Sequence, residues 1–269
     1  MVAALALSGV CAASQAPAQE SRPGAAFPAV LVPPLGERLD YRVTSRRFGR
    51  DGTLIEFVLH YDLVWQPAGR GFELKARLTR ITSDAPLAVR RVTTGLMAPL
   101  IGVAVNYLVS ADGSRIDLVD ADHVWALAVP GAARLGQTTP QDEANAMAAV
   151  LMTLPLAERN QLLTADVRAL VAQANPAIPR TAAGGPPGSA ISIRAQGKYT
   201  VIAKHDTATA LAASGPVGAL PLTIVSTWTI DDGTGLVTRA VVQTWVKGSG
   251  DAPPTLVEEH IGALIPVAP

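Results

Sequence analysis

The sequence is poor in cysteine and in aromatic residues, and it has no excess of either charge. Its 269 residues include one Cys, 4% aromatic side chains, and 22 basic against 22 acidic groups. Balanced charge argues against a nucleic-acid partner, because neutralising phosphates needs Lys and Arg gathered on one face. The scarcity of aromatic rings likewise argues against a site that stacks sugars or bases.

Long hydrophobic runs are missing as well, although the first 18 residues are uncharged and mostly apolar. This run ends by Ser14 and Gln15, short of the roughly 20 residues that cross a bilayer. A short apolar run followed by small residues is typical of a secretory signal peptide, here residues 1–18. Candidate cleavage sites follow Ala16-Pro17-Ala18 and Cys11-Ala12-Ala13.

These features predict an exported protein, periplasmic or secreted, with no transmembrane segment in the mature chain. A bacterial lipobox needs a small residue directly before its cysteine, and Val10 occupies that place. Lipid anchoring at Cys11 is therefore the weaker alternative. Cleavage after Ala18 would remove Cys11, and with it disulfides, thiol nucleophiles and cysteine metal sites.

Alternating polar and apolar residues predict an antiparallel sheet in the first half of the chain. A leader at 19–36, rich in Pro and Gly, is expected to be extended. Strands follow within 37–119, and the second strand has the longest alternation. Its apolar residues are Ile55, Phe57, Leu59, Tyr61, Leu63 and Trp65.

The second strand is expected to bury only one of its faces. Phe57, Leu59 and Trp65 point inward in this pattern, whereas His60 and Asp62 face solvent. A slip of one residue would expose the whole apolar set, so the choice of face should be firm.

The turn positions also predict which charges meet on the outer face of the sheet. Arg38 is expected opposite Asp62, and Asp40 opposite His60. The third strand would place Lys75 beside Asp62. Such a mixed-charge ladder contributes about 0.2–1 kcal/mol per pair, and it is favoured over a basic docking patch.

Between residues 120 and 175 the spacing of apolar residues becomes that of an α-helix. Thr139 can cap a helix that has Pro140 at its first position and ends at Pro155. A second helix carries a single apolar stripe that Asn175-Pro176 terminates. The stripe consists of Leu163, Val167, Leu170, Val171 and Ala174.

Proline and glycine then interrupt the pattern at 176–189, which is expected to be a linker. Alternation returns at 190–264, with a short last strand at 256–261. The order of strands, helices and strands favours an α+β fold. We expect one domain at 37–264, built as a curved, half-barrel-like antiparallel sheet with a central helical segment on one face.

Catalytic and metal-binding motifs are missing from the sequence. It contains no H-E-x-x-H, Walker loop, G-x-S-x-G or G-x-G-x-x-G. The four histidines lie far apart, and neighbours such as His260 and Glu259 would point to opposite faces of a strand. We therefore expect structural or solvated histidines, with no metal, no cofactor and no catalytic residue.

Three stretches together carry a resemblance. They are Leu39-Asp40-Tyr41, the segment from Tyr107 to Gly113, and the segment from Trp228 to Val237. With the signal peptide and the helical middle, they resemble secreted bacterial β-rich proteins of uncharacterised function. The architecture is similar to the curved half-barrels of periplasmic lipoprotein carriers, over about residues 37 to 264, and the resemblance assigns no functional residue.

The favoured interpretation is a non-enzymatic binding protein of the cell envelope. Its sheet and helices would enclose an apolar groove for an acyl chain or a hydrophobic partner segment, so the partner would be a lipid or a lipoprotein segment. The expected groove residues are Phe57, Leu59, Trp65, Leu163, Val167, Leu170, Val171 and Trp228. The rival interpretation is that these side chains form a filled core.

Two other classes of function stay open at this point. One is a hydrolase whose Asp and His residues are brought together only by the fold. The other is a structural or assembly role, which no specific feature of the sequence favours over the first two.

The N-terminal pattern leads to a prediction about export. The protein should be cleaved after Ala18 or Ala13, because small residues follow the short apolar run. Intact-mass measurement of the exported protein decides between the two sites. A mature species that retains Met1 would contradict the prediction.

Overall fold

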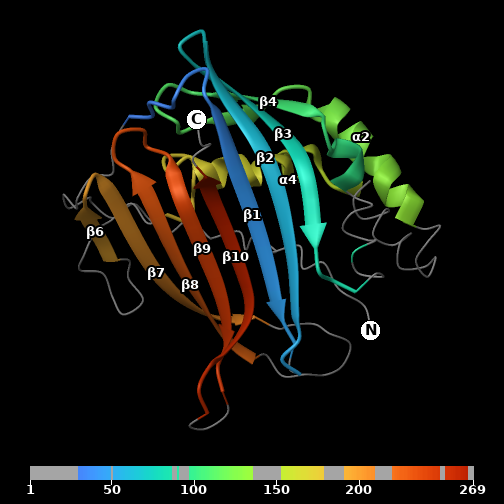
Figure 1. Cartoon of the computed structure of the whole chain (residues 1–269), viewed down its shortest axis with the longest axis vertical. Coiled ribbons are helices and arrows are strands. Elements are labelled where there is room, and N and C mark those ends of the chain that lie inside the picture. Colours follow the sequence, from blue (N-terminus) through green and yellow to red (C-terminus); the bar gives the residue numbers. More distant parts are fainter. Residues whose placement is uncertain are drawn as a thin grey trace.

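A ten-stranded antiparallel sheet with two open edges forms the body of the protein (Figure 1). The computed structural model describes residues 30–49, 51–86, 90, 97–135, 153–178, 191–209, 220–248 and 252–265. The signal peptide, the start of the helix expected from Thr139 and most of the linker at 176–189 lie outside these residues. The division of the chain into signal peptide, leader and one domain stays a prediction.

The sheet consists of two meanders that meet in its middle. The first contains β1 (Arg38–Phe48), β2 (Leu54–Ala68), β3 (Gly71–Ser83), β4 (Ala104–Val109) and β5 (Ile116–Leu118). The second contains β6 (Ile191–Ala195), β7 (Lys198–Thr209), β8 (Leu220–Asp231), β9 (Val237–Val246) and β10 (Thr255–Ile265). The order in space is β5-β4-β3-β2-β1-β10-β9-β8-β7-β6, so the first and last strands pair at the centre.

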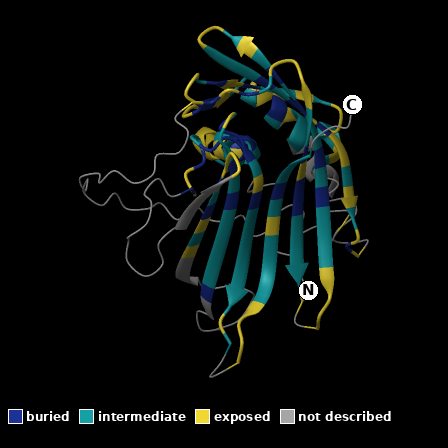
Figure 2. Cartoon of the chain, turned by 60° about the vertical axis from the view of Figure 1, so that its left-hand side comes forward, coloured by how far each residue is buried: buried dark blue, intermediate teal, exposed yellow. Residues whose placement is uncertain are grey.

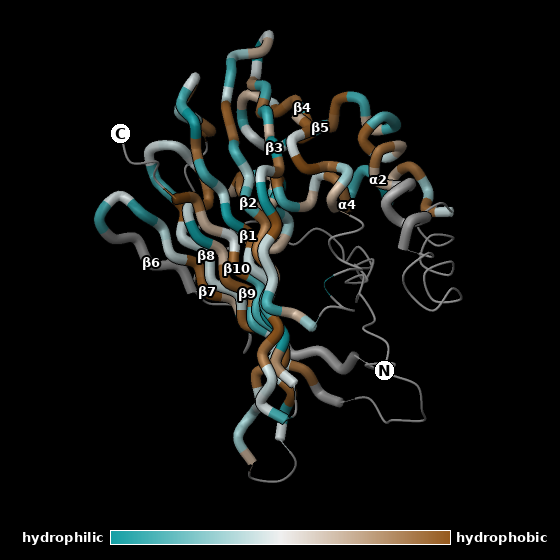
Figure 3. The backbone as a smooth tube through the Cα atoms, turned by 45° about the vertical axis from the view of Figure 1, so that its right-hand side comes forward, coloured by the Kyte–Doolittle hydropathy of each residue, from teal (hydrophilic) through white to brown (hydrophobic). Residues whose placement is uncertain are grey.

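The described helices lie between the two meanders in sequence. They are α2 (Ala121–Leu135) and α4 (Leu156–Leu170), and a 3-10 helix, η1 (Ala98–Leu100), precedes β4. Both α2 and α4 lie on the same side of the sheet (Figure 3), and α4 contacts β5 and β9.

The predicted α+β class, with a curved, unclosed antiparallel sheet and helices on one face, is confirmed. No helix within the described ranges combines the length and hydropathy needed to span a bilayer.

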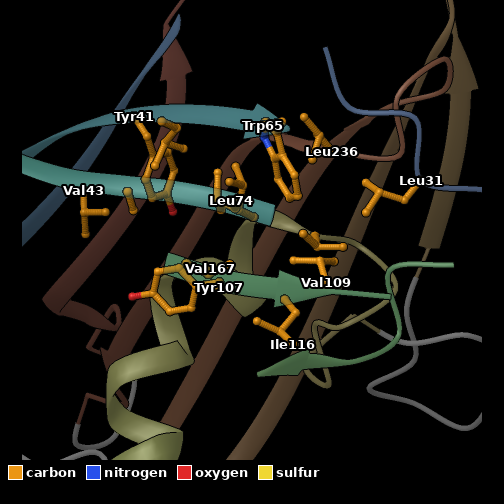
Figure 4. Close-up of a cluster of buried hydrophobic side chains, with 14 residues drawn as sticks. Leu31, Tyr41, Val43, Trp65, Leu74, Tyr107, Val109, Ile116, Val167 and Leu236 are labelled. Atoms are coloured by element: carbon orange, nitrogen blue, oxygen red, sulfur yellow. The ribbon is translucent and has the colours of Figure 1, made fainter. Parts of the chain in front are cut away.

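The face of the sheet that meets α4 is called the inner face below. Odd-numbered residues of β1 and β2, such as Tyr41, Leu63 and Trp65, point to it and join Val167 of α4 in the main hydrophobic cluster (Figure 4). A second cluster lies on the second meander. It includes Tyr199, Val201, Trp228 and Ile230.

The end of the leader belongs to the main cluster. Leu31 is 2% exposed, and the backbone N–H of Val32 donates to the carbonyl of Thr234 at 2.9 Å. Gly113 has a φ of 73°, and a Cβ there would lie 2.9 Å from Val171 Cγ1 and 3.3 Å from Leu31 Cβ. The close approach of the leader therefore depends on the missing side chain as well as on the left-handed turn.

Two predicted element ends are wrong. The apolar stripe does not continue helically to Ala174, because α4 ends at Leu170 and Val171 is extended, with φ −104° and ψ 111°. Val171 instead forms a bridge with Leu236 of the sheet. The last strand has 11 residues, Thr255–Ile265, rather than the expected short segment, because β1 and β9 pair with it on both sides.

The predicted register between the first two strands is wrong by two residues, although the faces are right. Arg38 pairs with Val64, and Asp40 pairs with Asp62. The turn is centred on Asp51, whose side chain accepts hydrogen bonds from the backbone and hydroxyl of Thr53. Arg38 nevertheless reaches Asp62 diagonally, with 2.7 Å between Nη2 and Oδ1.

The pairing with the third strand differs from the expected one in the same way. Lys75 pairs with Val64, and Arg77 rather than Lys75 lies beside Asp62. The expected alternation of inward and outward residues survives because the shift is again an even number of residues.

His60 lies on the outer face, but the expectation that solvent surrounds it is wrong. The residue is 8% exposed, and Nη2 of Arg80 lies 3.3 Å from its Nε2. A bulge next to His60 sets this pairing between β2 and β3. Burial and then the charges of Arg80 and Arg42 lower the pKa of His60, which favours the neutral ring.

Burial along the inner face is uneven, and this unevenness positions the candidate site. In β2, Leu63 and Trp65 are 2% and 0% exposed, whereas Phe57 and Leu59 on the same face are only half-buried. Figure 2 shows the same change along the strands, which become intermediate or exposed away from the helices. The apolar pattern of β2 therefore extends beyond the part that α4 and the leader cover.

This difference predicts unequal costs for one substitution at two positions of one strand face. Leu63→Ala should lower the free energy of unfolding by about 2–5 kcal/mol, because it leaves a cavity in a filled core. Leu59→Ala should cost clearly less, since its side chain is only partly buried in the protein. Denaturant unfolding of both variants measures the difference, and equal losses would contradict the uneven burial.

Candidate ligand-binding face

The candidate site is the part of the inner face that α4 and the leader do not bury. Paired residues of neighbouring strands share a face, so the strand register identifies its members from β3 across to β8. All of them have intermediate exposure. They are Ser45, Phe57, Leu59, Ile81, Ser83, Ile224, Ser226, Val242 and Thr244, and we call this set the half-exposed region.

The first meander contributes a contiguous apolar surface to this region. Leu59 pairs with Ile81 of β3 and with Val43 of β1, and Phe57 pairs with Ser45 and Ser83. Leu59 also packs against the main hydrophobic cluster. The half-exposed apolar side chains therefore continue the core rather than forming a separate patch.

A polar pair divides the region where β1 and β10 meet. Ser45 and His260 are direct partners across the two strands, and Ser45 Oγ lies 3.0 Å from His260 Nδ1. Ser45 is half-buried and His260 is exposed. The pair is flanked by Phe57 on the β2 side and by Val242 on the β9 side.

Helix α4 adds a carboxyl group above this pair. Asp166 Oδ2 accepts a hydrogen bond of 3.3 Å from the hydroxyl of Tyr61. Burial raises the pKa of Asp166, and His260 and the Tyr61 hydroxyl oppose that shift without cancelling it. The residue retains some exposed surface, but protein atoms surround the carboxyl group closely enough for loss of hydration to be the main effect.

Tyrosines enclose the same carboxyl group. Burial, followed by the nearby charge of Asp166, raises the pKa of Tyr41, of Tyr61 and of Tyr107. The hydroxyl of Tyr107 donates to the carbonyl of Leu163 at 3.0 Å. Tyr61 and Tyr107 thus attach α4 to the sheet by hydrogen bonds, and all three rings stay un-ionised phenols.

Gly262 provides the space that Tyr41 needs. A Cβ at Gly262 would lie 2.6 Å from the Tyr41 hydroxyl. Gly262 pairs with Val43, two residues along β10 from His260. The phenol of Tyr41 therefore limits the polar pair on one side.

An ion pair lies on the other side. Arg47 pairs with Glu258 across β1 and β10, and Arg47 Nε lies 3.6 Å from Glu258 Oε1. Both side chains are more than 40% exposed, at 42% and 44%. Such exposed pairs contribute little stability, but this one adds balanced charge to the edge of the half-exposed region.

Ser45, His260 and Asp166 are the residue types of a hydrolytic triad, but their setting lacks a catalytic feature. Ser45 is paired on both sides in the middle of the sheet, so the amides around it serve the strand ladders rather than an oxyanion hole. No metal-ligand group of three or more His, Cys, Asp or Glu side chains occurs among the described residues. The arrangement can bind and orient polar groups without an evident means of stabilising a reaction intermediate.

The predicted groove residues separate into two groups in the structure. Five of them are at most 5% exposed and belong to filled clusters: Trp65, Val167, Leu170, Val171 and Trp228. Trp228 lies in the second cluster, apart from the others. Phe57, Leu59 and Leu163 keep intermediate exposure. As the lining of an apolar groove, the eight residues remain a prediction.

Sequence reasoning missed the polar residues of the region. Asp166 had a detectable signal, because it lies three residues after Leu163 and four before Leu170, and so falls on the apolar stripe of its helix. A carboxyl group in such a stripe is a reason to look for buried partners. Ser45 and His260 had no comparable signal, since 215 positions separate them.

Comparisons with known proteins add little to this geometry. The sequence matches no protein-family model and no curated protein. The chain is structurally similar to a structure that concerns lipid–protein interactions in lipovitellin, with a TM-score of 0.38 and 12% identity, over 86% of this chain. It spans 26% of the lipovitellin chain, and the likeness is too distant to establish a shared fold.

The environment of Asp166 predicts a pH dependence of stability. Folding raises the pKa of the Asp166 carboxyl. Its contribution to the free energy of unfolding is therefore lost as the pH rises above the pKa in the unfolded chain, about 4, and through the pKa in the folded protein. The free energy of unfolding of Asp166→Asn should therefore increase relative to that of the wild type between about pH 4 and about pH 7. Denaturant unfolding at both pH values measures it, and a constant difference would contradict the assignment.

A control of opposite sign is available in the turn before β5. Hydrogen bonds from Ser110 and Ser114 lower the pKa of Asp112 to about 2. The stabilising effect of that carboxylate is present above about pH 4 and is lost as the pH falls. Asp112→Asn should therefore be destabilising near neutral pH, and its effect should fade in acid.

Proposed function

We propose that this protein is exported to the cell envelope and binds the acyl chain of a lipid on the half-exposed region of its inner face. The uneven burial carries the proposal: Phe57, Leu59 and Ile81 point to the same side as the core, yet they remain half-exposed. Contiguous apolar surface that stays in contact with water marks a binding surface more often than an isolated exposed residue does. Export rests on the N-terminal sequence pattern alone.

Apolar side chains of the half-exposed region keep part of their surface in contact with water. Removing apolar surface from water stabilises by about 25 cal/mol per Å². In the protein without a ligand, the half-exposed side chains of β2 and β3 lack part of this stabilisation. An acyl chain lying along them would supply it, at little cost in reorganisation because the buried clusters already fix the strands.

An acyl chain fits this surface better than a peptide segment does. The strands of the half-exposed region are paired on both sides, apart from β3 beyond the reach of β4, so their backbone groups are largely occupied. A bound peptide would bring N–H and C=O groups that need partners. An acyl chain has none, and it requires only apolar side-chain contact.

A hydrolase is the second candidate, and one observation favours it. Ser45 Oγ lies 3.0 Å from His260 Nδ1, and Asp166 acts electrostatically on the same ring. Cleavage of a long-chain acyl ester that disappears in Ser45→Ala would support this candidate over simple binding. The absence of such cleavage, with lipid binding intact, would leave the binding function.

The main experiment measures fatty-acid binding in two variants that carry the same substitution on opposite faces. Ile81→Glu places a carboxylate in the half-exposed region and should weaken binding of a fluorescent long-chain fatty acid by at least about tenfold. Ile202→Glu is the matched control, because Ile202 is a strand residue 37% exposed and lies on the face opposite its buried neighbour Val201. The control should bind as the wild type does.

Thermal unfolding provides an independent measurement. Wild-type protein should gain stability with increasing lipid concentration, as linkage requires, and Ile81→Glu should gain less. If the lipid-free wild type neither binds nor shows a concentration-dependent shift, the acyl-chain function is wrong and the structural or assembly role is favoured. Equal weakening by Ile81→Glu and Ile202→Glu would place the site elsewhere.

A further inference from the structure

We infer that Ser45 and His260 bind the head group of the lipid, and that this head group is uncharged and carries hydroxyl groups, as in a monoacylglycerol. The inference rests on the proposed function and narrows its ligand class. It concerns the polar pair that the register places between half-exposed apolar residues of the two meanders: Phe57 lies next to Ser45, and Val242 lies next to His260.

The position of the polar pair suits the end of an acyl chain. Ser45 is half-buried and His260 is exposed, so their polar atoms can be reached from the same side as Leu59 and Ile81. On one side the Tyr41 phenol occupies the space over Gly262. On the other side Arg47 and Glu258 bind each other. A head group is thus confined to the row in which Ser45 and His260 lie.

The hydrogen-bonding capacity of the pair matches a hydroxyl group. The 3.0 Å contact joins Ser45 Oγ to Nδ1 of His260, and it leaves Nε2 of the ring for another partner. A neutral imidazole has one donor and one acceptor nitrogen, and a serine hydroxyl both donates and accepts. A ligand hydroxyl has the same double capacity, whereas an ester or an alkane lacks the donor.

The charges that face this row disfavour an anionic head group. Asp166 approaches from α4, Glu258 and His260 from β10, Arg47 from β1, and Tyr61 supplies an uncharged phenol from β2. Arg47 is already bound to Glu258 at 3.6 Å. A ligand carboxylate would therefore lie beside the carboxyl of Asp166 without a free arginine or lysine of this row to balance it. A cationic head group would in turn meet Arg47.

The test compares lipids that share one acyl chain and differ only in their head group. They are monooleoylglycerol, oleate, methyl oleate and oleylamine, each competing with a fluorescent fatty acid for the wild-type protein. Monooleoylglycerol should bind most tightly. Ser45→Ala and His260→Phe should weaken its binding by about 3- to 10-fold, the usual effect of losing one hydrogen bond, and should leave methyl oleate unchanged.

Thr227→Val is the control for Ser45→Ala. Thr227 is also half-buried, but it lies on the outer face of β8, where it pairs with Ile202 and Val241. The variant removes a strand hydroxyl that lies outside the half-exposed region, so it should bind monooleoylglycerol as tightly as the wild type does. If His260→Phe does not fold, Ser45→Ala carries the test, because it removes a single oxygen atom.

The outcomes separate the inference from the function on which it rests. If no lipid binds, the proposed function fails. If all four lipids bind with equal affinity, or if Thr227→Val and Ser45→Ala behave alike, acyl-chain binding stands and the head-group inference is overturned. Preference for oleate or for oleylamine would also overturn it, since either shows that charge decides recognition.

Discussion

The pairing of β1 with β10 is the constraint on which the rest of the structure depends. Each meander by itself would present two open edges. Their junction, in which Asp40 pairs with Ile265 and Arg47 with Glu258, joins the two into one continuous sheet. The continuous inner face and the polar pair at its centre follow from this one antiparallel contact, and Tyr41, Val43 and Leu264 of the two strands join the main hydrophobic cluster.

The second determinant is the limited extent of the cover over that sheet. Helix α4 and the leader bury the inner face where Leu31, Trp65 and Val171 meet, and the hydroxyls of Tyr61 and Tyr107 bond α4 to the sheet. Beyond them, the same apolar alternation continues along β2 with less burial. In the proposed function, this less buried end of the strand pattern is where the ligand binds, and the more buried end is the filled core.

The same geometry explains why a carboxyl group is retained on an apolar helix stripe. Asp166 is costly to ionise where it lies, because burial raises its pKa. Replacing it by an apolar side chain would remove that cost, but it would also remove the acceptor of the Tyr61 hydroxyl. The group therefore bonds the helix to the sheet through Tyr61 and interacts electrostatically with His260.

Local periodicity in the sequence determined the α+β class, the inward direction of Tyr41, Leu63 and Trp65, and the presence of the second helix, because alternation and helical spacing depend only on nearby residues. It could not determine the register of the first hairpin, in which Arg38 pairs with Val64, because alternation is the same for any even shift between the strands. Nor could it show that His60 is covered, that α4 ends at Leu170, or that Ser45 meets His260 across 215 positions. Only the tertiary structure decides such contacts, since they depend on how two distant meanders meet and on where one helix stops covering the sheet.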